Sequence, residues 1–172
     1  MELSKITNFA LLHNHMTIEL LLKFFDFGSK PFVKLDELFR KELILALKGT
    51  DRPGMILSFV WEVSMHKEKE YVDNLWKSYT DNISNVCFVE LTCPQKIRLE
   101  RNKGTLRIKE KPSKADLTWS DNNLLEMDNN FVMNSSEKHL FPYPERHLNI
   151  DNSSLAPEVV AEKIILDCRV YH

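Results

Sequence analysis

Two histidines flank an asparagine near the start of the chain. Residues 9–17 read FALLHNHMT, so a short apolar run leads directly into His13, Asn14 and His15. Histidine exchanges protons near neutral pH and can act as a general acid or base. We therefore take His13 and His15 as candidate catalytic residues and all three as candidate substrate-binding residues. The structural alternative is that one of them caps a helix or satisfies a buried backbone group.

A second set of candidates is cationic and lies between positions 98 and 114. Its members are Arg98, Arg101, Lys103, Arg107, Lys109, Lys111 and Lys114. The planar fork of arginine binds phosphate oxygens in pairs, so such a cluster suits a phosphate-bearing ligand. A solvated charged face is the alternative for any single member. Residues 104–116 hold little apolar content, and we expect a mobile surface segment there.

The elements that position these residues follow from hydrophobic periodicity. Short apolar runs predict strands at 9–12, 55–61, 86–91 and 147–150. Helical spacing predicts helices at 16–25, 32–48, 67–79, 95–103 and 117–134, and a last helix from Pro157. Alternation of this kind predicts the α/β class with a parallel sheet. Ligands bind at the carboxyl ends of such strands, where the histidine triplet falls.

Composition indicates a single domain over residues 1–172. Hydrophobic residues make up 43% of the chain and the formal charge is −2, so no global attraction to nucleic acid or anionic membranes is expected. No apolar run approaches the roughly 20 residues that span a bilayer. Three cysteines without a CxxC pair indicate a reducing, cytoplasmic compartment, with Cys87 acting as a small buried hydrophobe.

Six segments, taken in order, resemble a bacterial family of P-loop kinase-like proteins that is grouped with shikimate kinases and small AAA-type ATPases. They are LLHNHMTIELL, FDFGSKPF, MILSFVWE, VCFVELTCP, RNKGTLRIKEKPSKADL and LNIDNSSLAPEVVAEKI. The likeness runs through nearly the whole chain. It implies a three-layer fold with a parallel sheet, and a lid at about residues 103–116.

The family's phosphate-binding loop, GxxxxGK[ST], is not present in this sequence. The four glycines, at positions 28, 49, 54 and 104, cannot be arranged into that spacing. The strand that leads into the loop is central in the family, so we expect a sheet that lacks its central first strand, between 55–61 and 86–91. Losing about five buried residues forfeits on the order of 10 kcal/mol. The chain is then an incomplete copy, or the two strands close up, or another chain fills the gap.

The resemblance also implies roles for particular residues. His13, Asn14 and His15 would contact the acceptor substrate. Glu62 would approach Mg²⁺ through water. The nucleotide would be contacted by Arg98, Arg101, Arg107, Lys114, Asp151 and Asn152. The implied cofactors are ATP and Mg²⁺.

The function that follows is transfer of the γ-phosphoryl of ATP to a small hydroxyl-bearing acceptor of unknown identity. Without the phosphate-binding loop we expect the chain as written to be inactive. The alternative is a non-catalytic binding or interaction module derived from the same fold. An unfilled sheet edge would also invite self-association. The letters HNH name a nuclease motif as well, but the metal-binding context of that motif is missing from the sequence.

Overall fold

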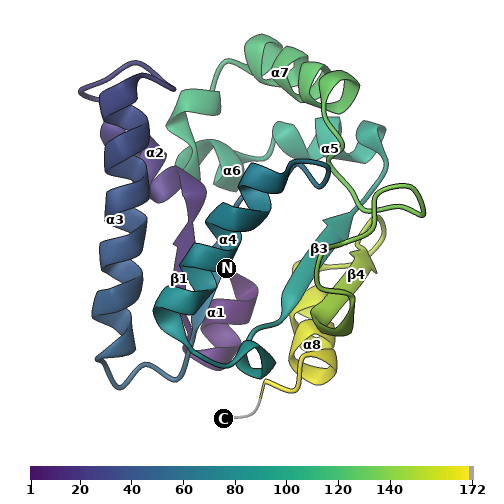
Figure 1. Ribbon diagram of the computed structural model, residues 1–172. Coiled ribbons are helices and arrows are strands. Elements are labelled where there is room, and N and C mark those ends of the chain that lie inside the picture. Colours follow the sequence, from purple (N-terminus) through teal and green to yellow (C-terminus); the bar gives the residue numbers. More distant parts are fainter. Residues whose placement is uncertain (171–172) are drawn as a thin grey trace.

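Strands and helices alternate along the chain in the computed structural model, which describes residues 1–170 (Figure 1). The strands are β1 (Ala10–His13), β2 (Met55–Ser58), β3 (Phe88–Thr92) and β4 (His147–Asp151). The α-helices are α1 (Glu2–Thr7), α2 (Asn14–Leu21), α3 (Lys30–Lys48), α4 (His66–Tyr79), α5 (Gln95–Asn102), α6 (Thr105–Glu110), α7 (Leu117–Asn130) and α8 (Pro157–Asp167). Three short 3₁₀ helices are η1 (Ile83–Asn85), η2 (Pro112–Lys114) and η3 (Pro144–Arg146).

The strands form two separate parallel pairs. β1 pairs with β2, with Ala10 opposite Met55, and β3 pairs with β4, with Phe88 opposite His147. Within the described residues no ladder joins β2 to β3. The predicted α/β class and the parallel pairing are therefore confirmed. The finer prediction, a three-layer kinase-like sheet, stays a prediction.

Two hydrophobic regions hold the strand pairs to their helices. Ile150 of β4 packs with Val160 and Ile164 of α8, and Leu3 of α1 adds to the same cluster. α1 consequently lies against α8, although the two helices come from opposite ends of the chain. On the other side of the molecule, α3 packs against both α2 and α4, and the side chain of Ile44 is completely buried.

The predicted helix at 32–48 is confirmed, and it begins two residues earlier than expected. Proline disfavours helix at the residue before it, which led us to start the helix after Pro31. In the structure Lys30 and Pro31 form the first turn of α3, where the missing N–H of proline costs nothing. The helix ends at Lys48, and Gly49 follows it as predicted.

The segment 104–116, expected to be a mobile surface segment, contains helical structure. Residues 105–110 form α6 and residues 112–114 form η2. The reason is that 105–110, TLRIKE, contains mostly good helix formers, and Pro112 starts a new short turn. The cations of this segment are therefore held on helical elements.

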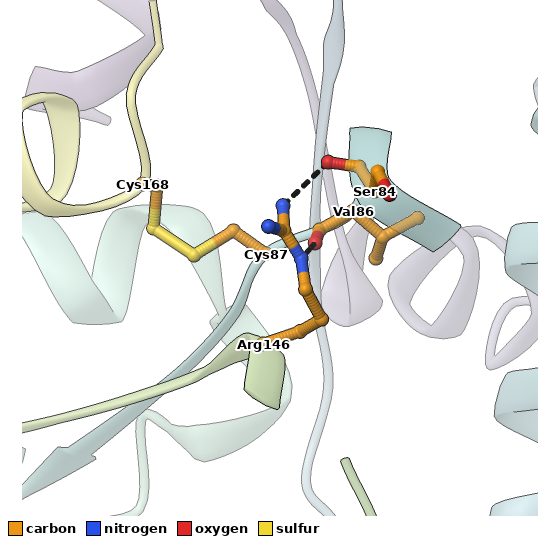
Figure 2. The surroundings of a disulfide bond; sticks show 5 residues. All are labelled: Ser84, Val86, Cys87, Arg146 and Cys168. Carbon is orange, nitrogen blue, oxygen red and sulfur yellow. Dashed lines mark hydrogen bonds between the residues drawn. A yellow bond between two sulfur atoms is a disulfide. The ribbon is translucent and has the colours of Figure 1, made fainter. Parts of the chain in front are cut away.

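The three cysteines do not behave as the sequence indicated. Cys87 and Cys168 form a disulfide, so the expectation that Cys87 is a free, buried thiol is wrong (Figure 2). The two residues are 81 positions apart, which is why no local spacing pointed to the pair. Arg146 beside them donates to the carbonyl oxygens of Val86 and Ser84. Cys93 is free.

None of the helices within residues 1–170 is long and apolar enough to cross a membrane.

Candidate functional site

The histidine triplet spans the junction of β1 and α2. His13 is the last residue of β1 and keeps an extended backbone, while Asn14 and His15 already belong to the first turn of α2. We had predicted a polar apex before a helix at residue 16, so the helix begins two residues earlier. Because the strand passes directly into the helix, His15 is turned into the protein and is only 7% exposed.

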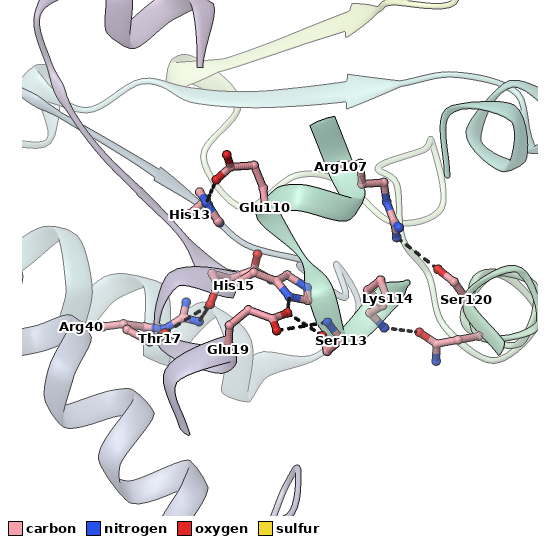
Figure 3. Close-up of polar contacts among 12 residues, drawn as sticks. His13, His15, Thr17, Glu19, Arg40, Arg107, Glu110, Ser113, Lys114 and Ser120 are labelled. Carbon is pink, nitrogen blue, oxygen red and sulfur yellow. Dashed lines mark hydrogen bonds and ion pairs between the residues drawn. The ribbon is translucent and has the colours of Figure 1, made fainter. Parts of the chain in front are cut away.

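His15 is held by a carboxylate one helical turn further on. Its Nδ1 lies 2.8 Å from Oε1 of Glu19. Ser113 of η2 donates to the same carboxylate through its backbone N–H at 3.1 Å and its hydroxyl at 2.5 Å (Figure 3). Glu19 therefore fixes the orientation of His15 and also ties the segment 105–114 to α2.

Two opposing effects set the protonation of this pair. Burial lowers the pKa of His15, and the positive charges of Lys111 and Lys114 lower it further, against the opposing effect of Glu19. Burial acts to raise the pKa of Glu19, but hydrogen bonds from Ser113 and His15 outweigh it and hold that pKa below its usual value. The favoured state at neutral pH is a neutral imidazole beside an ionised carboxylate.

Lys111 and Lys114 act electrostatically on His15, and Arg107 acts on both lysines. Burial lowers the pKa of Arg107, of Lys111 and of Lys114, and the charge of Arg107 lowers the pKa of both lysines. Glu19 opposes this effect at the lysines, and Asp121 opposes it at Arg107. The positive charge of these three side chains would stabilise an anion placed among them.

The cations are anchored by neutral partners. Nζ of Lys114 donates to the side-chain oxygen of Asn123 at 2.8 Å and lies 4.3 Å from the ring centre of Trp119. Arg107 makes long hydrogen bonds of 3.4 Å to the carbonyl of Asn102 and to the hydroxyl of Ser120. These contacts orient Arg107 and Lys114 without neutralising their charge.

His13 closes the site on the side of β1. Its Nε2 lies 3.5 Å from Oε2 of Glu110, the last residue of α6 (Figure 3). Both ring nitrogens are buried, and neither has a hydrogen-bond partner among the described residues. Buried polar atoms are usually paired, so His13 has hydrogen-bonding capacity to offer a ligand.

A network under α2 fixes the position of Asn14. Arg40 of α3 donates to the backbone carbonyl of Asn14 at 3.2 Å and pairs with Asp36 at 3.0 Å. Asp36 also accepts a short hydrogen bond from Thr17. In these contacts Asn14 supplies its backbone, and they hold the start of α2 against α3.

The predicted nucleotide-contacting residues fall into two groups. Lys114 acts on His15, whereas Arg107 contacts Asn102 and Ser120 and acts on Lys114. Arg98 instead makes a two-pronged ion pair with Asp128 of α7, with both hydrogen bonds at 2.7 Å. Its charge is therefore matched within the protein.

The ends of β3 and β4 bring together the remaining predicted residues. Arg101 donates to the side-chain oxygen and to the backbone carbonyl of Asn152, both at 2.7 Å. Asp151 accepts the backbone N–H of Ser153 at 2.8 Å in the same turn. Arg101 and Asn152 thus bind each other, and the carboxylate of Asp151 is engaged by Ser153. Their predicted contact with a nucleotide stays a prediction.

Glu62 is buried, and its carboxylate accepts hydrogen bonds from two neighbouring segments of the chain. Its Oε1 accepts the N–H and the hydroxyl of Ser64 and the N–H of Val132. Within residues 1–170 no group of three or more His, Cys, Asp or Glu is arranged to hold a metal ion. The predicted role of Glu62 toward Mg²⁺ stays a prediction.

Sequence reasoning missed several members of the site, namely Glu19, Glu110, Lys111 and Ser113. One of them had a usable signal: Glu19 lies four residues after His15, the spacing that places two side chains on one helix face. Lys111 was counted in the cationic cluster without a role of its own. Glu110 and Ser113 come from residues 104–116, which we expected to be a mobile surface segment.

Comparisons with family models, with curated proteins and with solved structures found no significant match to this chain.

Proposed function

We propose that this protein binds a phosphate-bearing small molecule between α2 and the segment 105–114. The observation that carries the proposal is that Arg107, Lys111 and Lys114 come from one short segment, which Ser113 ties to Glu19 of α2. Burial lowers the pKa of all three cations, and the charge of Arg107 lowers that of both lysines. Assembling three cations in a partly buried place costs free energy, which a bound anion would recover. Phosphate carries the charge and the acceptor oxygens that suit such a cluster.

The neighbouring histidine suggests a role in proton transfer. Since Glu19 accepts the proton on Nδ1 of His15, the lone pair of the imidazole is on Nε2. A neutral histidine oriented by a carboxylate can take a proton from a hydroxyl group. His15 is then the general base toward an acceptor hydroxyl, and His13 is a hydrogen-bonding partner of the same ligand.

Together with the sequence resemblance, the site favours the class of ATP-dependent small-molecule phosphotransferases. In that class, ATP and Mg²⁺ supply the transferred phosphoryl group and a phosphate-binding loop cradles it. We infer that residues 1–172, which contain no GxxxxGK[ST] sequence, bind the ligand and do not catalyse the transfer by themselves. The second candidate is a binding module with no transfer step, and it is favoured by the same missing sequence.

Calorimetric titration with inorganic pyrophosphate and with Mg-ATP tests the proposal. We expect the double variant Lys111→Ala, Lys114→Ala to bind pyrophosphate about a hundredfold more weakly, at roughly 1.4 kcal/mol for each lost contact. The matched control is the double variant Lys103→Ala, Lys109→Ala, which also removes two positive charges but from exposed positions, and it should leave binding unchanged. Equal losses in both variants would contradict the proposal, as would an unsubstituted protein that binds neither ligand. Turnover of Mg-ATP by residues 1–172 alone would contradict both the second candidate and the inference that these residues do not catalyse the transfer by themselves.

A further inference from the structure

One oxygen atom of Glu19 receives hydrogen bonds from two residues that lie far apart in the sequence. Its Oε1 accepts Nδ1–H of His15 at 2.8 Å and the hydroxyl of Ser113 at 2.5 Å. Its Oε2 accepts the backbone N–H of Ser113 at 3.1 Å (Figure 3). His15 and Ser113 therefore draw on the negative charge of the same carboxylate.

This shared carboxylate lies in a place with little access to water. The side chain of Glu19 is 21% exposed and that of His15 is 9% exposed. Where water is scarce, a hydrogen bond acts more strongly on the charge of its acceptor than it does at an open surface. A change at Ser113 should therefore reach the imidazole of His15 through Glu19.

Residues 105–114 act on His15 in two ways, and both have the same sign. The hydrogen bonds from Ser113 occupy a carboxylate whose charge would otherwise stabilise the protonated ring. The positive charges of Lys111 and Lys114 lower the pKa of His15 directly. The contact of this segment with α2 therefore favours the neutral imidazole.

The other charged groups near the start of α2 have partners of their own. On the side of β1, His13 faces Glu110 of α6, with 3.5 Å between the nearest nitrogen and oxygen. On the side of α3, Arg40 pairs with Asp36 at 3.0 Å. Among the described residues, the side-chain and backbone donors that reach the carboxylate of Glu19 are the three already named.

We propose that Ser113 is a positioning residue that acts on His15 through Glu19, so that the contact of residues 105–114 with α2 sets how readily His15 takes up a proton. While the segment lies on α2, the ring is neutral and can accept a proton from a hydroxyl group. The role of His15 as a general base rests on the proposed function, whereas the coupling does not. The base is then available when the segment that carries the cations is in place.

An NMR titration of the His15 ring, made without ligand, measures the coupling. Ser113→Ala removes the hydroxyl donor and leaves more of the charge of Glu19 to His15, so the pKa of His15 should rise by roughly 0.5. Ser113→Thr keeps the hydroxyl and should keep the pKa. Thr118→Ala is the control, since it removes a hydroxyl from an exposed position on α7. An unchanged or lowered pKa in Ser113→Ala overturns the proposal, because a purely structural role would not move this titration upward.

Two further backgrounds identify the route of the effect. In Glu19→Gln the carboxylate is gone, so adding Ser113→Ala should no longer raise the pKa of His15. An equal rise with and without the carboxylate overturns the proposal. In the double variant Lys111→Ala, Lys114→Ala the rise should persist, because it does not pass through the lysines. Its disappearance there would show that the segment acts only by its charge, and would also overturn the proposal.

Pyrophosphate separates this proposal from the proposed function. Bound pyrophosphate would offset the charges of Lys111 and Lys114, so its addition to the unsubstituted protein should raise the pKa of His15. No such rise, with the effect of Ser113→Ala intact, would contradict the proposed function and leave the coupling supported. A rise with pyrophosphate and none in Ser113→Ala would overturn the coupling and support the anion site.

Discussion

At the scale of single residues, the protonation of His15 is the property on which the proposed chemistry depends. Its pKa is lowered mainly by burial, with a further contribution from the lysines, while Glu19 pulls in the opposite direction. A depressed histidine pKa favours the neutral form in the folded state. His15 therefore contributes fully to the free energy of unfolding when the pH is above 6.5, the pKa of histidine in the unfolded chain. This contribution is lost as the pH falls through the lower pKa of the folded state.

The variant Glu19→Gln tests how strongly the Glu19 carboxylate raises the pKa of His15. The amide keeps the shape of the side chain and removes its charge, so the raising effect of Glu19 disappears and the pKa of His15 should fall further below 6.5. An NMR titration of the His15 ring measures the change. Glu162→Gln, on the exposed surface of α8, is the matched control and should leave the pKa of His15 unchanged. A rise in the pKa of His15 in Glu19→Gln would mean that the carboxylate does not act on the imidazole.

Much of this site was accessible from the sequence because residue type alone identifies it. His13, His15, Arg107 and Lys114 were chosen for what imidazole and cationic groups can do. In the structure His13 lies near Glu110 and His15 is influenced by Lys114, while Arg107 contacts Asn102 and Ser120. Glu19 was missed even though its spacing from His15 is helical, because a single glutamate on a helix usually faces water. Ser113 could not be found, since its role depends on how residues 105–114 fold over α2.

At the scale of elements, the ion pair between Arg98 and Asp128 joins α5 to α7. The side chain of Asp128 is 13% exposed and that of Arg98 is 33% exposed. Burial acts to raise the pKa of Asp128, and the hydrogen bonds from Arg98 and Gln95 outweigh it, so the pKa is lowered overall. The stability from this group is present above its unfolded value of 3.8 and is lost as the pH falls through the lower folded value.

Asp128→Asn should therefore lower the free energy of unfolding by about 1 kcal/mol at neutral pH, a value reduced for the partial exposure of Arg98. The loss should shrink at acidic pH, where the unsubstituted protein also loses the pair. Urea denaturation at two pH values measures both effects. Glu126→Gln changes an exposed carboxylate on the same helix and serves as the control. A loss that is equal at both pH values would show that the pair contributes through packing and not through charge.

Elements were predictable where periodicity is strong and less so where it is weak. α3, α4 and α8 appear close to where the apolar spacing placed them. β2 is shorter than the apolar run that predicted it, because the run continues to Trp61 after the pairing with β1 ends at Ser58. Residues 105–110 form a helix that apolar spacing did not predict, because many residues of the segment are charged. Apolar spacing is a poor guide for a helix whose contacts are largely polar.

At the scale of the whole molecule, the arrangement of the strands and the disulfide were beyond local patterns. Parallel pairing followed from the alternation of strands and helices. The separation into two pairs depends on which strands have neighbours, and the sequence suggested it only through a resemblance. The link between Cys87 and Cys168 joins the start of β3 to the end of α8, and such a contact exists only after the chain has folded.

The disulfide should account for a substantial part of the stability. It closes a loop of 81 residues, so in the unfolded state it removes much conformational freedom. Cys168→Ser should lower the free energy of unfolding by about 2–4 kcal/mol, as measured by urea denaturation without reductant. Cys93→Ser is the matched control, since Cys93 is free and should leave stability within about 0.5 kcal/mol.

Reduction distinguishes the effect of the crosslink from that of the serine side chain. With a thiol reductant present, the unsubstituted protein should become about as unstable as Cys168→Ser, and that variant should not change further, because it has no crosslink to lose. Thiol alkylation followed by mass spectrometry should label one cysteine in the oxidised protein and three after reduction. Three labelled thiols before reduction would mean that α8 and β3 are held by packing alone. In that case the core formed by Ile150, Val160 and Ile164 would have to keep the end of the chain in place.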